Sequence, residues 1–574
     1  MNASLPRELA PRRAAPEGGQ LLLAIALLIT SLAYLGTLHF NFVYDDGPQI
    51  ISNPTLTSWR SLPSLFAGNT WSFLIPGWAG NYYRPIFMSW LLLNRMLWGL
   101  NPTAWHASTL LVHLLATWMS FLVARQILGS GTQAGFVALL FGLHPIHIES
   151  VAWISGVTDP LMAIFVFAAF WAWIRGELTS GPRIPWRALS AVFYLVACLS
   201  KETAILLPLV LVAYDLLCRD QSTVTRTVLR TWPLWIAAAL YIALRAFALR
   251  GLLHPIGMPS PLLTIPTILW GYFRRLLWPV HLSLFYDTPP VTAASEWRFW
   301  LPLIAWIAVA IAVYLARRSR ILLFSLVWIF SFLAPAILGL PVFYVGEWIH
   351  DRYLYLPSFG FCLLLGYAIA KLPSHRRLFA LPAAPASAML GLVALMAFGT
   401  AWQQQYWRNS LLLFLHSVNE APRSSWAKGY LAAELLRRGD RDDAQRMYEA
   451  ALQLDPSNWK NNVAYGALLY QMGDYRRADE FFTRAIAGDP TDANAHFNQG
   501  LSRFNYGNYT GAETSLREAL RRDPRLPQAH YWLGYSLERQ GLLDDAREQY
   551  LAEIHQHPDS AADARRRFQM LAQK

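Results

Sequence analysis

Hydrophobic and polar residues follow two different patterns along this chain, and the change falls near Trp402. Before it, apolar runs alternate with short polar connections. The longer runs hold roughly 17 to 25 residues, enough for a helix to cross the hydrocarbon core of a bilayer. The pattern predicts about eleven spans, several of them short. We place them at residues 20–38, 104–128, 132–143, 152–174, 188–199, 204–218, 232–249, 299–316, 321–340, 354–370 and 378–401.

Beyond Trp402 the sequence becomes polar and repeats with a period of 34 residues. Three residue types recur at this spacing: Pro456, Pro490, Pro524 and Pro558; Gly439, Gly473, Gly507 and Gly541; Ala444, Ala478, Ala512 and Ala546. Proline after a second helix, glycine at the turn and a small residue where two helices pack predict tetratricopeptide repeats. We expect four, at residues 425–458, 459–492, 493–526 and 527–560, and a polar capping helix at 561–574. Stacked repeats form a concave surface suited to a peptide or protein partner.

Composition agrees with a membrane protein, because 55% of the 574 residues are hydrophobic and only 15% are charged. These values exclude an ordinary soluble enzyme. The net charge of +12 gives little support to nucleic-acid binding, since Lys and Arg at span ends set orientation. Cys198, Cys218 and Cys362 lie in apolar runs, which excludes a disulfide framework and a thiolate metal site. The expected fold class is all-α, a polytopic membrane helical bundle followed by a tetratricopeptide-repeat α-solenoid.

Basic residues predict the orientation in the membrane. Arg7, Arg12 and Arg13 precede the first span, which lacks a cleavage site and is expected to be a retained anchor. Residues 1–19 would then be a cytoplasmic tail, 20–402 the membrane domain and 403–424 a linker. Alternation places the long loops 39–103 and 250–298 and the C-terminal repeats on the extracytoplasmic side, periplasmic or lumenal. Both loops mix aromatic, proline and charged residues, which predicts half-buried interfacial helices.

Two adjacent carboxylates, Asp45 and Asp46, follow the first span in the sequence Tyr44-Asp45-Asp46-Gly47. Charge so close to hydrocarbon is costly unless it is paired or used. A neighbouring like charge and partial burial both raise a carboxyl pKa toward neutrality, as a general base requires. The alternative is a solvated Asp-Asp-Gly turn.

A second polar cluster contains His144, His147, Glu149, Trp153 and Asp159. Two histidines three residues apart with a nearby glutamate could bind zinc. However, the proline between them interrupts the helix that would align the rings, and no third distant ligand is evident, so we predict no metal. We expect these groups to line a wet cavity at the outer face, with a purely structural polar corner as the alternative.

A third group contains cations near the outer ends of later spans: Lys201 beside Glu202, Arg275, and Arg352 between Asp351 and Tyr353. The planar fork of arginine engages phosphate oxygens in pairs. In the alternative, Lys201 and Glu202 neutralise each other, as do Asp351 and Arg352. Since acids, imidazoles and cations all map to one side of the membrane, we expect that side to be the active face.

These same residues carry a resemblance to the transmembrane and tetratricopeptide-repeat-containing protein family. It rests on Tyr44-Asp45-Asp46, Tyr83-Arg84-Pro85, the run from His144 to Asp159, Ser200-Lys201-Glu202, and the run from Asp351 to Pro357. The resemblance spans nearly the whole chain. It implies a GT-C type membrane fold and transfer of a sugar, mannose in eukaryotic members, from a polyprenyl-phosphate carrier to protein hydroxyls. It also implies that Asp45 and Asp46 are the catalytic acidic pair of the first outer loop.

The expected reaction is a single inverting displacement, in which Asp45 or Asp46 takes the hydroxyl proton and cations stabilise the departing phosphate. No cofactor is required beyond the lipid-linked sugar, which is a co-substrate. The expected substrate-binding residues are Arg84, His144, His147, Glu149, Trp153, Asp159, Lys201, Glu202, Arg275, Asp351, Arg352 and Tyr353. The rival hypotheses are a noncatalytic membrane-anchored tetratricopeptide-repeat scaffold and, ranked last, a transporter.

Overall fold

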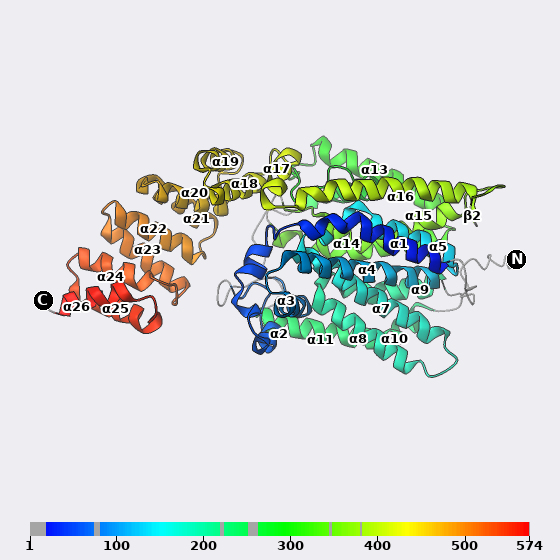
Figure 1. Ribbon diagram of the computed structural model, residues 1–574, viewed down its shortest axis with the longest axis horizontal. Helices are drawn as coiled ribbons and strands as arrows, with labels where there is room; N and C mark the ends of the chain where they lie inside the picture. The colour runs from blue at the N-terminus through cyan, green and yellow to red at the C-terminus, as the bar shows by residue number, and fades with distance from the viewer. Residues whose placement is uncertain are drawn as a thin grey trace. The chain divides into compact units, whose positions relative to one another are not determined.

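The computed structural model describes residues 19–73, 81–218, 223–250, 262–343, 347–378 and 381–572 (Figure 1). Two compact units divide the chain, residues 1–416 and 417–574. The described residues contain a single sheet, in which β1 (Arg377–Leu378) pairs antiparallel with β2 (Leu381–Pro382). The predicted all-α class is therefore confirmed. The basic residues before the first span lie outside the described residues, as do parts of the two long loops.

Helices cover every predicted span in the first unit. They are α1 (Gly19–Tyr34), α2 (Leu62–Ala67), α3 (Pro85–Trp98), α4 (Pro102–Leu128), α5 (Gly131–Leu143), α6 (Ile148–Ala152), α7 (Thr158–Leu178), α8 (Ile184–Ser200), α9 (Leu207–Cys218), α10 (Val224–Arg230), α11 (Trp232–Leu249), α12 (Ile265–Leu277), α13 (Trp297–Leu315), α14 (Arg320–Leu338), α15 (Pro357–Ala370) and α16 (Ala383–Gln403). Both long loops contain helices, α2 and α3 in the first and α12 in the second. Helix α17 (Ser410–Glu420) lies where a linker was expected.

Seven of the described helices, with their short extensions, are long and apolar enough to cross a membrane. They are Gly19–His39, Pro102–Leu128, Ile154–Leu178, Trp232–Leu249, Trp297–Leu315, Arg320–Val342 and Ala383–Trp407. Helix α5 and the segment Pro145–Ala152 make an eighth if they are taken as one span bent by 49°. The remaining predicted spans are the shorter helices α8, α9 and α15. The multispan bundle is confirmed, and the number of crossings depends on these short helices.

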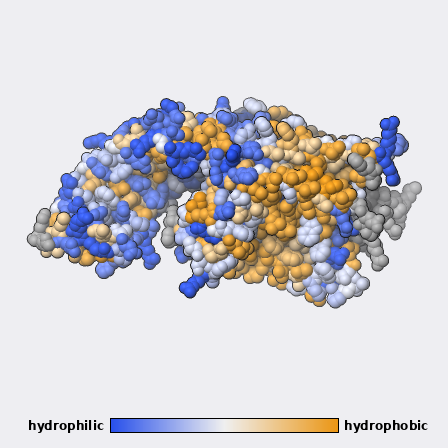
Figure 2. All heavy atoms as spheres, in the orientation of Figure 1, coloured by the Kyte–Doolittle hydropathy of each residue, from blue (hydrophilic) through white to orange (hydrophobic). Residues whose placement is uncertain are grey.

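Burial differs strongly among the candidate spans. In the apolar window of α7, 83% of the residues are buried, whereas in α13 only 6% are. Along α13, Leu301, Ile304 and Ile307 each expose more than half of their surface. Figure 2 shows hydrophobic residues gathered over the first unit. Apolar surface of this extent is stable in contact with lipid but not in contact with water. The exposures therefore agree with a membrane bundle that has α7 at its centre and α13 at its surface.

Glycines bring α1 close to α5. A Cβ on Gly135 would lie 2.4 Å from the Leu22 side chain, and one on Gly142 would lie 2.4 Å from Thr30 Oγ1. Small residues allow membrane helices to approach closely, where dispersion contacts replace the hydrophobic effect as the attractive force. The first span is thereby held against the bundle along its length, and the loop that follows it starts from a fixed point.

The second unit is built of helix pairs. They are α18 (Ser425–Arg438) with α19 (Arg441–Leu454), α20 (Trp459–Gln471) with α21 (Tyr475–Gly488), α22 (Ala493–Asn505) with α23 (Tyr509–Arg522), and α24 (Ala529–Arg539) with α25 (Leu543–Gln556), followed by α26 (Ala562–Ala572). The four periodic glycines have φ between 83° and 92°, the left-handed conformation that ends a first helix. The four periodic alanines are fully buried between paired helices. The predicted repeat solenoid is therefore confirmed.

Candidate functional site

The acidic turn after the first span is anchored by Asp46. This side chain is fully buried, and its Oδ1 accepts hydrogen bonds from the backbone N (2.9 Å) and the Oγ (2.6 Å) of Ser155. Its Oδ2 accepts one from the Val43 backbone N at 3.0 Å. The carboxyl group thus ties the loop after α1 to the short turn Ile154–Val157 that precedes α7. Three donors already occupy it, so it is poorly placed to take a proton from a substrate.

Burial raises the pKa of Asp46 to about 6, and the hydrogen bonds from Ser155 and Val43 oppose this rise. The preceding residue, Asp45, is only half-buried. Tyr44, one position earlier, has a φ of 53°, which is uncommon for a bulky residue and which strains the turn. The turn therefore directs one carboxyl group inward as an anchor and leaves the other partly accessible.

Four buried or half-buried ion pairs lie among the other predicted residues. They are Arg84 with Glu202, Lys201 with Asp159, Arg352 with Glu149, and Arg275 with Asp351. Each pair joins segments that are far apart in the sequence. Lys201 and Glu202 therefore do not form an ion pair with each other, and neither do Arg352 and Asp351; each is paired with a residue from another segment. The helix ends expected on one side of the membrane are brought together in space by these contacts.

The pair of Lys201 and Asp159 is the most buried. Lys201 Nζ donates to both carboxylate oxygens at 2.7 Å, and the two side chains are 1% and 3% exposed. Lys201 Nζ also lies 5.1 Å from the centroid of the Tyr353 ring. Asp159 lies at the start of α7 and Lys201 directly after α8, so the pair fastens these two helices to each other at one end of the bundle.

Arg352 connects the cluster to the acidic turn. Its Nη1 donates to Glu149 Oε1, and its backbone N donates to Glu149 Oε2 at 2.9 Å. The guanidinium carbon lies 5.4 Å from the centroid of the Trp153 ring, and the Tyr44 ring lies 5.5 Å from that same ring. The cation and the acidic turn therefore contact one indole. The Arg352 side chain stays 17% exposed, so it can still reach a ligand.

Arg84 and Glu202 form the most exposed pair of the cluster. Arg84 donates from Nε at 2.9 Å and from Nη2 at 2.5 Å, one bond to each carboxylate oxygen. Its guanidinium carbon lies 4.5 Å from the centroid of the Tyr82 ring. The side chains are 15% and 26% exposed. The nearby charges of Arg84 and Arg352 act, with burial, to lower the pKa of Lys201.

Arg275 and Asp351 lie at the edge of the cluster. Their closest side-chain atoms are 3.7 Å apart, and Tyr286 Oη donates to Asp351 Oδ2 at 2.7 Å. Burial raises the pKa of Asp351 to about 7, although Arg275 acts to lower it. The guanidinium carbon of Arg275 lies only 3.5 Å from the centroid of the Tyr286 ring. Arg275 is therefore held by a ring and a carboxyl group, and it is 9% exposed.

The two histidines are placed in the packed interior of the bundle. His144 Nε2 contacts the Leu276 carbonyl at 3.1 Å, and its Nδ1 accepts from the Ile146 backbone N at 3.2 Å. His147 Nε2 contacts Ser358 Oγ at 2.8 Å. Both residues are fully buried. Among the described residues, no group of three His, Cys, Asp or Glu side chains is arranged to hold a metal ion.

Three contributors were not predicted from the sequence. Tyr286 holds Asp351, Tyr82 packs under Arg84, and Tyr44 shapes the acidic turn through its positive φ. Only Tyr44 carried a signal, its position directly before an Asp-Asp-Gly turn. The other two belong to aromatic-rich loops in which many rings look equivalent until their partners are known.

Comparison with known proteins adds a family context. The chain matches the tetratricopeptide repeat family over residues 435–498 and again over 497–561. A protein O-mannosyl-transferase of Caenorhabditis elegans is 27% identical over 470 residues, covering 79% of this chain and 65% of the relative. Protein O-mannosyl-transferase TMTC1 of Homo sapiens is 27% identical over 501 residues, covering 77% of this chain and 56% of the relative. Protein O-mannosyl-transferase TMTC4 of Homo sapiens is 25% identical over 488 residues, covering 74% of this chain and 64% of the relative.

The resemblance to the transmembrane and tetratricopeptide-repeat-containing family is confirmed by these relatives, since the similarity runs through the membrane part and into the repeats. The chain spans less than two thirds of the length of each of these curated relatives.

Proposed function

We propose that this protein is a membrane glycosyltransferase that moves a mannose-like sugar from a polyprenyl-phosphate donor to Ser or Thr hydroxyls of proteins. The relatives are named protein O-mannosyl-transferases, which supports the reaction class. The observation that carries the proposal is the arrangement around Trp153, where Tyr44 of the acidic turn and the partly exposed Arg352 contact the same ring. An acid for the acceptor and a cation for the leaving phosphate are the two groups that such a transfer requires.

Asp45 is the general base in this proposal and Asp46 is a positioning residue. The assignment follows from the burial of the two carboxyl groups. The buried oxygens of Asp46 accept hydrogen bonds from Ser155 and Val43, whereas Asp45 is only half-buried and can be reached from outside. Asp45 takes the proton from the acceptor hydroxyl as its oxygen bonds to the anomeric carbon. The bond from that carbon to the phosphate oxygen breaks, its electron pair leaves with the lipid phosphate, and the configuration inverts.

Arg352 and Arg84 stabilise the departing phosphate in this proposal. Both are partly exposed, and each is already oriented by a carboxylate and an aromatic ring, so little side-chain freedom is lost on binding. Lys201, Asp159, Glu149 and the two histidines are buried, and we assign them the role of holding these arginines and the surrounding helix ends in place. Glu202, whose side chain is 26% exposed, is assigned a substrate contact in this proposal.

The membrane orientation follows from the same proposal. The ion-pair cluster and the acidic turn would face the extracytoplasmic or lumenal side, with the N-terminus in the cytoplasm and the C-terminal repeats extracytoplasmic or lumenal. The repeats would recruit the acceptor or a partner protein on their concave surface. Cysteine labelling from either side of sealed vesicles, with one cysteine placed in the acidic loop and one in the last repeat, tests this orientation.

The deciding experiment uses the purified full chain in lipid nanodiscs with a polyprenyl-phosphate mannose donor and a panel of Ser- and Thr-containing acceptor proteins. We expect transfer of mannose and release of polyprenyl phosphate in equal amounts. The Asp45→Asn variant should lose transfer by on the order of a hundredfold or more, as for removal of a general base. Asp544→Asn, an acid-to-amide change at a carboxylate that is 97% exposed in the repeats, is the matched control and should keep full activity.

Two outcomes contradict the proposal. Full activity of Asp45→Asn would remove Asp45 from the chemistry. Absence of phosphate release by the wild-type chain across donors and acceptors, while it still binds proteins through its repeats, would favour the noncatalytic scaffold.

A further inference from the structure

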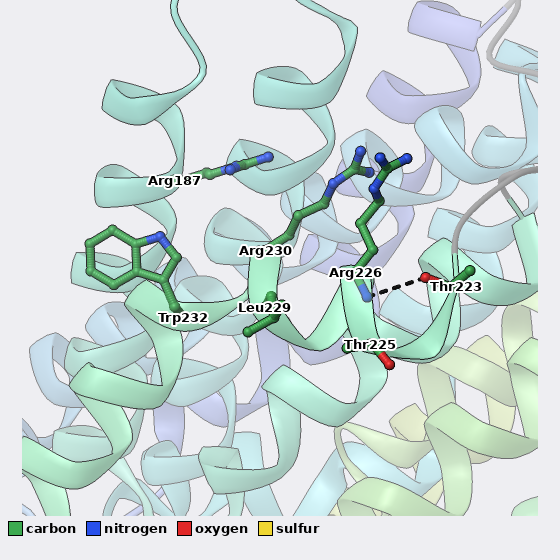
Figure 3. Close-up of a pocket in the computed structure, with 7 residues that line it drawn as sticks. All are labelled: Arg187, Thr223, Thr225, Arg226, Leu229, Arg230 and Trp232. Carbon is green, nitrogen blue, oxygen red and sulfur yellow. Dashed lines mark hydrogen bonds between the residues drawn. The ribbon is translucent and has the colours of Figure 1, made fainter.

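A basic pocket lies at the end of the bundle opposite the ion-pair cluster. It has a volume of about 500 Å³ and is lined by Arg187, Thr223, Thr225, Arg226, Leu229, Arg230 and Trp232 (Figure 3). Helix α8 begins beside this pocket and ends next to Lys201, and α11 begins at Trp232 and runs away from it. The pocket is therefore separate from the proposed site of sugar transfer.

The charge of this pocket is unbalanced. Three of its lining residues are arginines, and none is an acid. Arg187 Nη2 donates to Glu177 Oε1 at 2.8 Å, but Arg226 and Arg230 have no ion pair within the part of the chain that the structure describes. These two lie one helical turn apart on α10, and Figure 3 shows their guanidinium groups extending together from that helix. Like charges at this spacing repel each other unless an anion lies between them.

The rim of the pocket is apolar and faces outward. Leu229 is 68% exposed and Trp232 is 55% exposed. Trp232 is also the first residue of a candidate membrane span. The end of a span lies at the level of the lipid headgroups, where tryptophan is enriched. Hydroxyl groups of Thr223 and Thr225 complete the lining. A ligand at this position would meet cations at one end and hydrocarbon-facing side chains at the other.

We propose that this pocket binds the phosphate headgroup of an anionic membrane phospholipid. Arginine pairs recognise phosphate oxygens by charge-assisted hydrogen bonds, and basic pockets between membrane helices suit anionic headgroups. A lipid also accounts for the apolar rim, because its acyl chains would lie along Leu229 and Trp232. The competing explanation is that these arginines only set the orientation of the spans, as basic residues at helix ends do in general.

The test compares two double variants of the full chain in nanodiscs of phosphatidylcholine that contain phosphatidylglycerol as a minor component. Arg226→Gln with Arg230→Gln removes two charges from the pocket. Arg317→Gln with Arg318→Gln removes two exposed charges from the connection between α13 and α14, which the pocket does not include. Bound phosphatidylglycerol is counted by native mass spectrometry after extraction into mild detergent. We expect about 25-fold weaker retention in the pocket variant, about fivefold for each arginine, and unchanged retention in the control.

A second measurement tests whether the pocket variant, Arg226→Gln with Arg230→Gln, is still correctly folded. Its melting temperature in pure phosphatidylcholine should equal that of the wild type, and the rise that phosphatidylglycerol gives the wild type should be lost. Equal loss of lipid in both variants would mean general attraction to the membrane surface and would overturn the proposal. Unchanged retention in the pocket variant would overturn it too. Displacement of the lipid by glycerol phosphate would assign the pocket to a soluble phosphate compound instead.

Discussion

The ion pair of Lys201 and Asp159 allows a direct test of whether the charged cluster holds the fold together. In Lys201→Met the ammonium group that lies 2.7 Å from both carboxylate oxygens is lost, while Asp159 stays buried at 3% exposure. Breaking a buried ion pair from one side costs about 3 to 5 kcal/mol. Protonating a carboxyl group of ordinary pKa at pH 7 costs about 4 kcal/mol, which gives the same magnitude by an independent route.

The double variant Lys201→Met with Asp159→Leu should regain most of this stability, because apolar residues of similar size often replace a buried pair without loss. The coupling free energy between the two sites should therefore be about 3 kcal/mol or more in a double-mutant cycle. The assay is unfolding in mixed micelles followed by circular dichroism. Arg446→Met breaks an exposed pair with Asp443 in the repeats and should cost less than about 1 kcal/mol.

Two results would refute this reasoning. One is a Lys201→Met variant whose stability lies within about 1 kcal/mol of the wild type. The other is a double variant that loses as much as the sum of the single changes. If the double variant is stable but transfers no sugar, the pair acts on the substrate as well as on the fold, and its role in the proposed function becomes direct.

Three further predictions follow from the structure. Because burial raises the pKa of Asp46 from 3.8 to about 6, the stability that this carboxyl group contributes is present at low pH and is lost as the pH rises through about 6. The free energy of unfolding should fall by about 3 kcal/mol over this range in the wild type, and Asp46→Asn should remove the fall, as measured by denaturation at several pH values. Arg352→Lys should keep the fold but lower sugar transfer by roughly tenfold or more, measured as kcat, because lysine lacks the planar fork. Gly500→Ala places a Cβ 2.6 Å from Leu516 and should cost about 1 to 3 kcal/mol in thermal unfolding of the repeats.

Much of the architecture could be predicted because its signals are local or periodic. A long apolar run needs only its own length to specify a span, and the glycine at Gly439 recurs at the same position of every repeat. Such patterns also predicted which ends of the spans would carry the acids and cations. They required no knowledge of which helix packs on which.

The partners within the cluster could not be predicted in this way. Neighbours in sequence suggested that Lys201 would pair with Glu202, but the backbone there leaves a helix and directs the two side chains to different partners. Lys201 meets Asp159, 42 residues earlier, and Glu202 meets Arg84, 118 residues earlier. Such pairing depends on the packing of α3, α7 and α8. The positive φ of Tyr44 is also a product of the folded surroundings.

The ion pairs imply an order for the biogenesis of this protein. Asp159 and Lys201 flank the consecutive helices α7 and α8, so a hairpin of the two can neutralise both charges as soon as it leaves the ribosome. Arg352 pairs with Glu149, 203 residues earlier, and that carboxylate must wait in the translocon or in a wet crevice until α14 has been inserted. The constellation proposed to bind phosphate is therefore completed late, and a truncated chain that ends before Arg352 would insert its early spans yet lack the partner of Glu149.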